Sequence, residues 1–307
     1  MRPRAAGETG ARHASDNLRG MAWMVLAMAA FALEDALLKE VARMLPIGQV
    51  LVLFGIGGAL VFGLCRREGM QPLWHADARS KPMWVRAGFE ITGRLFYVLA
   101  IALTPLSSAT AILQATPVLV VLGARFYFGE RVGAVRWVAV LLGLAGVAVV
   151  LRPTAGEFSV LSLLTVVGMV GFAGRDLASR AVPVTLGTRH LGFYGFLAVV
   201  VAGALYAVWQ GQAWVWPDRA GMAALVVAVL VGTGAYASLM KAMRTGDVAA
   251  VTPLRYTRLL FGVGMGVVAF GEQVDAITLA GCAVILLAGL LLTWDARRSR
   301  RRVQARP

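Results

Sequence analysis

Apolar runs of about twenty residues recur along the whole chain, and they limit its fold more than any other feature. A helix of about 20 residues, rising 1.5 Å per residue, crosses the ~30 Å hydrocarbon core of a membrane. The sequence is 59% hydrophobic and only 15% charged. A soluble domain is about half apolar and about a quarter charged. The sequence therefore predicts an all-α integral membrane protein.

Turn residues and charges divide these runs into ten predicted transmembrane helices. They cover residues 20–42, 47–64, 83–103, 106–128, 133–151, 158–182, 190–209, 219–243, 247–270 and 274–294. An even number of spans puts both termini on one side of the membrane. Nineteen Lys and Arg residues then lie in segments on that side and four on the other. The positive-inside rule therefore predicts cytoplasmic termini in a cell (inner) membrane.

The two halves of the chain share a sequence pattern. FALEDALLKEV, which starts at Phe31, matches FAGRDLASRAV, which starts at Phe172, at an offset of 141 residues. FGERV (128–132) matches FGEQV (270–274) at an offset of 142. Because five helices is an odd number, the second copy is predicted to be inverted, as in many secondary transporters. The predicted organisation is a basic tail (1–19), a first repeat (20–153), a second repeat (154–294) and a basic tail (295–307).

Two longer segments carry a family resemblance. They read GERVGAVRWVAVLLGLAGVAVVLRP (129–153) and VAAVTPLRYTRLLFGVGMGVVAFGEQVD (248–275). They resemble the ends of the two repeats of the drug/metabolite transporter superfamily, EamA type. The form RYTRLLFG is most similar to the branch of S-adenosylmethionine-uptake and riboflavin-type carriers. The resemblance implies ten helices in two inverted repeats around a central cavity that opens alternately to each side of the membrane.

Charged side chains inside apolar helices are the main functional signal, because inserting each one costs at least ~2.5–3.5 kcal/mol. Span 247–270 carries Arg255 and Arg258 on one predicted helix face, with Tyr256 between them. These arginines either bind an anionic or carboxylate group of a ligand or pair with acids and lock the bundle. The sequence leaves both open. Further candidates for the cavity wall are Arg94, Tyr97, Gln114 and Arg175.

The acidic candidates lie past the middle of two repeated helices. Glu34 and Asp35 occupy, in the first half, the positions of Arg175 and Asp176 in the second. Burial favours the neutral form of a carboxylic acid. Glu34, Asp35 and Asp176 are therefore also candidates for proton coupling.

Other acids are predicted to have structural roles. Glu90 lies one helical turn from both Arg86 and Arg94, and is their simplest internal partner. Glu130 and Glu272 each follow a glycine at the end of a span. The family carries this Gly-Glu pair in both repeats, and we interpret each glutamate as a hydrogen-bond acceptor at a helix end.

The function predicted from these features is secondary-active transport of a small polar organic metabolite by alternating access. S-adenosylmethionine or a related metabolite is one candidate, and an exporter of amino acids or drugs or a riboflavin-type carrier is an alternative. A polytopic enzyme would need a nucleophile, a base or a metal cluster at the membrane face, and the three histidines show no metal-binding spacing. A channel would need continuous polar stripes. We therefore expect no enzymatic activity, no metal and no cofactor.

The expected partners are a small-molecule substrate and the lipid bilayer, with a homodimer as a possible assembly. The six arginines that follow Trp294 offer nucleic-acid or anionic-lipid binding as one interpretation. Basic flanks also orient membrane proteins. We predict that the tail fixes the topology and binds no nucleic acid.

Overall fold

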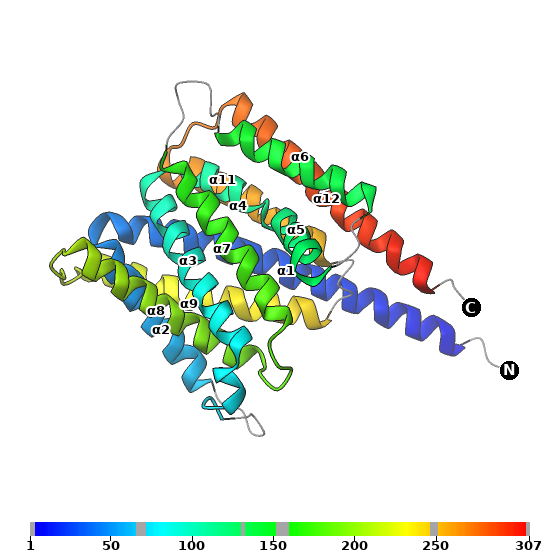
Figure 1. The fold of residues 1–307 in the computed structure, drawn as a ribbon, viewed down its shortest axis with the longest axis horizontal. Helices are drawn as coiled ribbons and strands as arrows, with labels where there is room; N and C mark the ends of the chain where they lie inside the picture. The colour runs from blue at the N-terminus through cyan, green and yellow to red at the C-terminus, as the bar shows by residue number, and fades with distance from the viewer. Residues whose placement is uncertain (1–3, 66–71, 130–132, 152–159, 246–250, 305–307) are drawn as a thin grey trace.

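The computed structural model describes residues 4–65, 72–129, 133–151, 160–245 and 251–304, and every regular element in these ranges is helical. The α-helices are α1 (Arg4–Met44), α2 (Ile47–Leu64), α3 (Lys81–Leu103), α4 (Leu106–Leu113), α5 (Thr116–Phe128), α6 (Ala134–Leu151), α7 (Ser162–Arg180), α8 (Thr188–Gln210), α9 (Arg219–Thr245), α11 (Thr257–Phe270) and α12 (Ala276–Gln304). The short 3-10 helices η1 (Ala76–Arg79) and η2 (Thr252–Tyr256) precede α3 and α11. The free ends of α1 and α12 extend from the same side of the bundle (Figure 1). The predicted all-α fold is confirmed for these residues.

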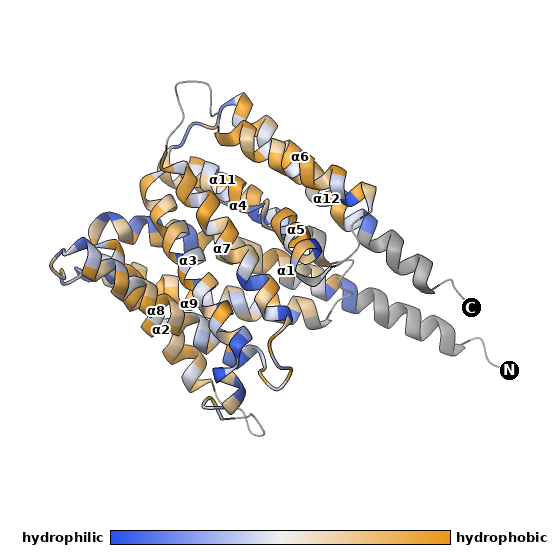
Figure 2. Ribbon diagram, viewed as in Figure 1, coloured by the Kyte–Doolittle hydropathy of each residue, from blue (hydrophilic) through white to orange (hydrophobic). Residues whose placement is uncertain are grey.

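Seven helical segments within the described ranges are long and apolar enough to cross a membrane. They are α1, α2, α4 together with α5, α6, α8, α9 and α12. The other predicted spans correspond to α3 and α7, which carry internal charges, and to α11, which has only 14 residues. Apolar residues dominate the helices of the bundle (Figure 2). The chain is therefore a multi-pass membrane protein.

Two predicted spans are interrupted near proline residues. Span 106–128 divides into α4 and α5 at Gln114 and Ala115. Pro117 lies in the first turn of α5, where its missing N–H removes no helical hydrogen bond. In span 247–270, Arg255 lies in η2, whereas Arg258 lies in the first turn of α11. Span 247–270 is therefore not one regular α-helix, because η2, which has a proline in its first turn and contains Arg255, precedes α11.

Helices from the two halves of the chain pack in pairs. These pairs are α1 with α9, α2 with α8, α3 with α7, and α6 with α12. The α6–α12 pair forms one edge of the bundle (Figure 1). Glycines permit the closest contacts, because they let two backbones approach. At the α3–α7 crossing, a Cβ on Gly171 would lie 2.3 Å from the backbone nitrogen of Gly93.

Gly171→Ala is expected to lower the free energy of unfolding by about 1–3 kcal/mol, as overpacking does elsewhere. The added methyl group meets backbone atoms, which cannot rotate away. SDS titration of the protein in mixed micelles measures the change. Gly88→Ala in α3 is the matched control, because a Cβ there meets nothing within 4 Å. Equal stability of the two variants would contradict the close α3–α7 contact.

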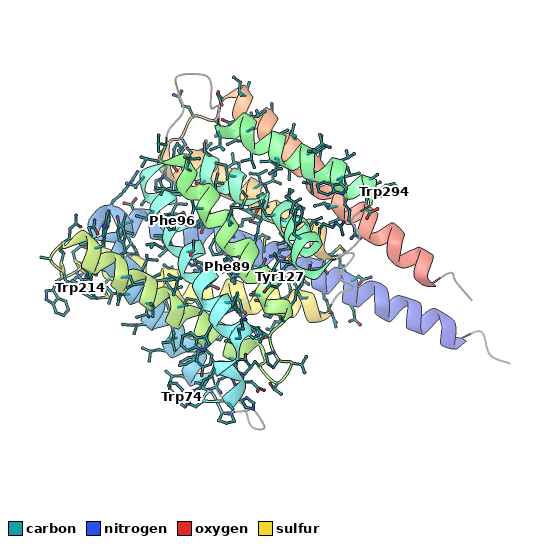
Figure 3. The ribbon with its side chains drawn as sticks, viewed as in Figure 1. Trp74, Phe89, Phe96, Tyr127, Trp214 and Trp294 are labelled. Atoms are coloured by element: carbon teal, nitrogen blue, oxygen red, sulfur yellow. The ribbon has the colours of Figure 1, made fainter. Side chains whose placement is uncertain are left out.

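Tryptophan side chains lie exposed near helix ends, where interfacial residues of a membrane protein belong. Trp74 and Trp216 are 79% and 92% exposed. Trp74, Trp214 and Trp294 all lie at the edges of the bundle (Figure 3). Their positions agree with membrane-interface anchoring of the helix ends.

Candidate functional site

Five polar side chains from three helices meet inside the bundle, and we name them the central cluster. They are Glu34 and Asp35 of α1, Arg94 and Tyr97 of α3, and Arg258 of α11. Arg94 Nη1 donates to Glu34 Oε1 at 2.8 Å, and Arg258 Nη2 donates to Asp35 Oδ2 at 2.6 Å. The Tyr97 hydroxyl donates to the same Asp35 oxygen at 3.0 Å. Segments distant in sequence therefore build one ionic site.

The central cluster is deeply buried and electrically balanced. The side chains of Glu34 and Asp35 are each 1% exposed, and those of Arg94 and Arg258 are 14% and 17% exposed. Two positive and two negative charges face one another, so each buried charge has an opposite partner. Without that partner, desolvation would make each charge strongly unfavourable.

The central cluster keeps unused hydrogen-bonding capacity. Asp35 Oδ1 and the Nε atoms of Arg94 and Arg258 are buried without a hydrogen-bond partner. The guanidinium carbons of Arg94 and Arg258 lie 5.4 and 5.2 Å from the ring centres of Phe54 and Phe31. Such cation–π contacts help to hold each guanidinium group in place. The cluster can therefore offer both donors and an acceptor to a ligand.

Helix geometry explains how α1 supplies two separate ion pairs. Successive residues of an α-helix point about 100° apart, so Glu34 and Asp35 face different neighbours. Glu34 also lies against α9, where a Cβ on Gly232 would be 3.0 Å from the Glu34 carboxyl carbon. The absence of a side chain at Gly232 makes room for the Glu34 carboxylate.

A second cluster lies between α3 and α7. Arg175 Nη2 is 2.8 Å from Asp176 Oδ1, and Arg175 Nη1 is 3.4 Å from Glu90 Oε1. Arg86 Nη2 lies 3.6 Å from Glu90 Oε2, and Arg86 Nε donates to Ser179 Oγ at 3.1 Å. The side chains of Arg175 and Asp176 are 25% and 31% exposed and those of Arg86 and Glu90 are each 6% exposed, so this cluster is open only on its α7 side. Ser179 was not among the predicted residues, since a single serine in a helix gives no distinctive sequence signal.

The predicted pairing along α3 is only half correct. Glu90 does pair with Arg86, as its spacing indicates. Arg94 pairs instead with Glu34 of α1, which its side chain reaches across the helix interface. Glu90 receives Arg175 of α7 as its second partner. Tertiary packing thus replaces one of the two expected contacts within the helix.

Glu272 joins α1 to the start of α4, an arrangement that we name the Glu272 clasp. Its carboxylate oxygens accept hydrogen bonds from the backbone nitrogens of Leu106 at 2.6 Å and Ser107 at 2.9 Å. Lys39 Nζ lies 3.5 Å from Glu272 Oε1 and donates to the Thr104 carbonyl oxygen at 2.6 Å. A negative charge at a helix N-terminus is favourable, because free N–H groups point toward it.

The clasp confirms Glu272 as a helix-end acceptor, whereas Glu130 lies outside the described residues. Sequence reasoning missed the contribution of Lys39. The duplication already aligned Lys39 with Arg180, and this repeated basic position was the signal that could have identified it.

The remaining predicted residues, Gln114, Arg255 and Tyr256, do not join the ion pairs of the central cluster. Gln114 Nε2 donates to the backbone oxygen of Arg255 at 3.1 Å, which links the α4–α5 break to η2. Tyr256 is buried against α12, where a Cβ on Gly289 would lie 1.9 Å from the Tyr256 ring. In the described part of the chain, no group of three or more His, Cys, Asp or Glu residues is placed to hold a metal ion.

Comparison with known proteins identifies the family to which this arrangement belongs. The profile of the EamA-like transporter family matches residues 18–152 and, separately, residues 159–294. The chain belongs to the EamA-like transporter family. The resemblance drawn from the sequence is therefore confirmed.

Relatives of this EamA-like protein are named as transporters. It is 28% identical over 281 residues to a pseudopaline exporter of Pseudomonas aeruginosa, across 89% of this chain and 95% of the relative. It is 25% identical over 290 residues to a riboflavin transporter of Vibrio cholerae, across 92% and 96% of the two chains. It is 22% identical over 289 residues to an S-adenosylmethionine uptake transporter of Rickettsia prowazekii, across 92% and 95%. The predicted branch agrees with these relatives.

The EamA-like chain also matches a protein of known crystal structure. The TM-score is 0.59 at 25% sequence identity, and the match covers 93% of this chain and 99% of that one. The similarity therefore extends over most of the chain.

Proposed function

We propose that the chain is a secondary-active transporter that moves a small polar organic metabolite across a cell (inner) membrane by alternating access. The observation that carries this proposal is the central cluster, a balanced set of ion pairs buried in a membrane protein. Buried ion pairs add little stability compared with apolar packing. Ionisable residues inside membranes commonly mark substrate pathways. The named relatives, which are transporters rather than enzymes or channels, support the same function.

The scaffold that we infer has ten spans in two inverted repeats, with both termini in the cytoplasm. At the repeat offset, α1 corresponds to α7, and α3 corresponds to α9. The α1–α9 and α3–α7 pairs are then equivalent, while the α2–α8 and α6–α12 pairs each join two equivalent helices. This packing pattern and the two family matches support an inverted duplication. The repeated pairs Glu34/Asp35 and Arg175/Asp176 differ in exposure, which is compatible with alternate opening.

The charge balance of the central cluster favours a substrate that carries both signs of charge. A carboxylate on the substrate would replace Asp35 at Arg258, and a cationic group would replace Arg258 at Asp35. No charge would then be left buried and unpaired. S-adenosylmethionine or a related metabolite is one candidate; an amino-acid or drug exporter and a riboflavin-type carrier are the alternatives. Glu34, Asp35 and Asp176 stay candidates for proton coupling.

Proteoliposomes containing the purified chain are expected to show saturable uptake and counterflow of one substrate from a screen of S-adenosylmethionine, riboflavin and amino acids. The double variant Asp35→Asn/Arg258→Gln removes both charges together and leaves neither unpaired. We expect it to lower uptake by about 10- to 100-fold, the effect of losing ~1.5–3 kcal/mol of charge-assisted binding. The same substrate should raise the melting temperature of the wild type and not that of the double variant.

Glu40→Gln is the control, because Glu40 lies on the same helix in an exposed pair with Arg43. It should transport like the wild type. Uptake that neither saturates nor shows counterflow would indicate a channel and contradict the carrier. Equal stabilisation of the wild type and the double variant by the substrate would remove Asp35 and Arg258 from the binding site.

A further inference from the structure

An apolar groove with a volume of about 670 Å³ lies on the outside of the bundle between α1, α9 and α11. Its walls include Leu26, Ala30 and Leu33 of α1, Gly234 of α9 and Gly264 of α11. None of its lining residues, all within the described ranges, is charged. The groove is therefore suited to a hydrocarbon chain and unsuited to a polar ligand.

Two glycines leave the walls of this groove open. Glycines in these helices often serve close packing, as Gly171 does against α3 and Gly232 does against Glu34. By contrast, a Cβ added to Gly234 or Gly264 would meet nothing within 4 Å. Both glycines face the same groove. The described part of the chain leaves that space unfilled. Close packing within the protein therefore does not explain why glycine occurs at either position.

The groove lies at the depth of the membrane hydrocarbon. Its α1 wall belongs to the candidate span Asp16–Met44, and Gly234 belongs to the span Arg219–Met243. Leu260 and Val268 on the α11 wall are 66% and 86% exposed. At this depth the surrounding medium is lipid chains rather than water. We propose that the groove binds one acyl chain of a membrane phospholipid.

The site would place the lipid directly beside α1 and α11, two of the three helices that carry the central cluster. Leu33 of the groove immediately precedes Glu34 in α1. Phe261 of the groove lies one helical turn after Arg258 in α11. The acyl chain would therefore pack against both helices that form the Asp35–Arg258 pair. The proposal depends on the groove alone and stands whether or not the chain transports a metabolite.

Photocrosslinking tests the site. The full chain is reconstituted in phosphatidylethanolamine vesicles containing phosphatidylglycerol with a diazirine in its acyl chain. After irradiation, the labelled residues are located by mass spectrometry. We expect several-fold denser labelling at 26–33, 231–238 and 260–268 than on the outer face of α6, where Leu141 is 64% exposed. Equal labelling of the groove and α6 would overturn the proposal.

Filling the groove provides the matched comparison. Gly234→Leu/Gly264→Leu is expected to reduce labelling of the groove to the level of α6, because the new side chains occupy the open space. Gly88→Leu introduces leucine where a Cβ also meets nothing within 4 Å, but outside the groove, and should leave groove labelling unchanged. Unchanged labelling in the filled variant would overturn the proposal. So would a groove that is labelled only after dilution to one protomer per vesicle, because a second copy of the chain would then be its occupant.

Discussion

Asp35→Asn is expected to lower the free energy of unfolding by about 3–5 kcal/mol, the usual cost of removing one partner from a buried ion pair. Asparagine keeps the shape of the side chain but leaves Arg258 without a negative partner. Asp35 is 1% exposed and lies 2.6 Å from Arg258, so little solvent is available to replace the lost charge. SDS titration in mixed micelles measures the change.

Two further variants separate loss of the ion pair from loss of packing. Asp35→Asn/Arg258→Gln removes both charges and should recover most of the stability lost in Asp35→Asn. Glu40→Gln alters a solvent-exposed pair, and exposed pairs contribute only about 0–1 kcal/mol. If Asp35→Asn unfolds like Glu40→Gln, the Asp35–Arg258 pair is not a buried, energetically coupled pair.

The double variant also decides whether the Asp35–Arg258 pair binds substrate or only locks the bundle, the two roles that the sequence left open for Arg258. A residue that only locks the bundle becomes dispensable once its partner is neutralised as well. A residue that binds substrate remains necessary for transport even when its partner is neutralised. A double variant that is as stable as the wild type but does not bind substrate would assign the Asp35–Arg258 pair to recognition. A stable double variant with full transport would assign the pair to packing.

The helical scaffold could be predicted because the length of an apolar run can be read from the local sequence alone. The boundaries of α2, at Ile47–Leu64, coincide with the predicted span. Pro117 is the local signal for the division of span 106–128 into α4 and α5, because proline favours the first turn of a helix. The start of α11 was harder to predict from the sequence, because the change from 3-10 to α-helix between Arg255 and Arg258 leaves no periodic signal.

The membership of the central cluster was predictable, but its pairing was not. A charge in an apolar helix must find a partner, so Glu34, Asp35, Arg94 and Arg258 could all be selected from the sequence. Which acid meets which arginine depends on the distances between helices. Spacing along α3 favoured Glu90 as the partner of Arg94, yet Arg94 pairs with Glu34 across the α1–α3 interface. Sequence periodicity describes one helix and does not contain that interhelical distance.

Glu272→Ala is expected to lower the free energy of unfolding by about 3 kcal/mol, since each hydrogen bond to a charged group contributes ~1.5–3 kcal/mol. The variant leaves the backbone nitrogens of Leu106 and Ser107 without their acceptor and Lys39 without its carboxylate. The measurement is again SDS titration in mixed micelles. Gln273→Ala is the control, because Gln273 is the exposed neighbour of Glu272. Equal stability of the two variants would show that the clasp does not hold α1 and α4.

The same measurement, applied to Glu130 of the first repeat, tests whether the two repeats pack alike. Glu130 aligns with Glu272 at the offset of 142 residues, although it lies outside the described residues. If the two repeats share one packing scheme, Glu130→Ala should cost a similar free energy of unfolding to Glu272→Ala. A large effect of Glu272→Ala with no effect of Glu130→Ala would confine the clasp to the second repeat. Comparable losses from both variants would mean that each repeat fixes the start of a helix in the other through the glutamate of its Gly-Glu pair.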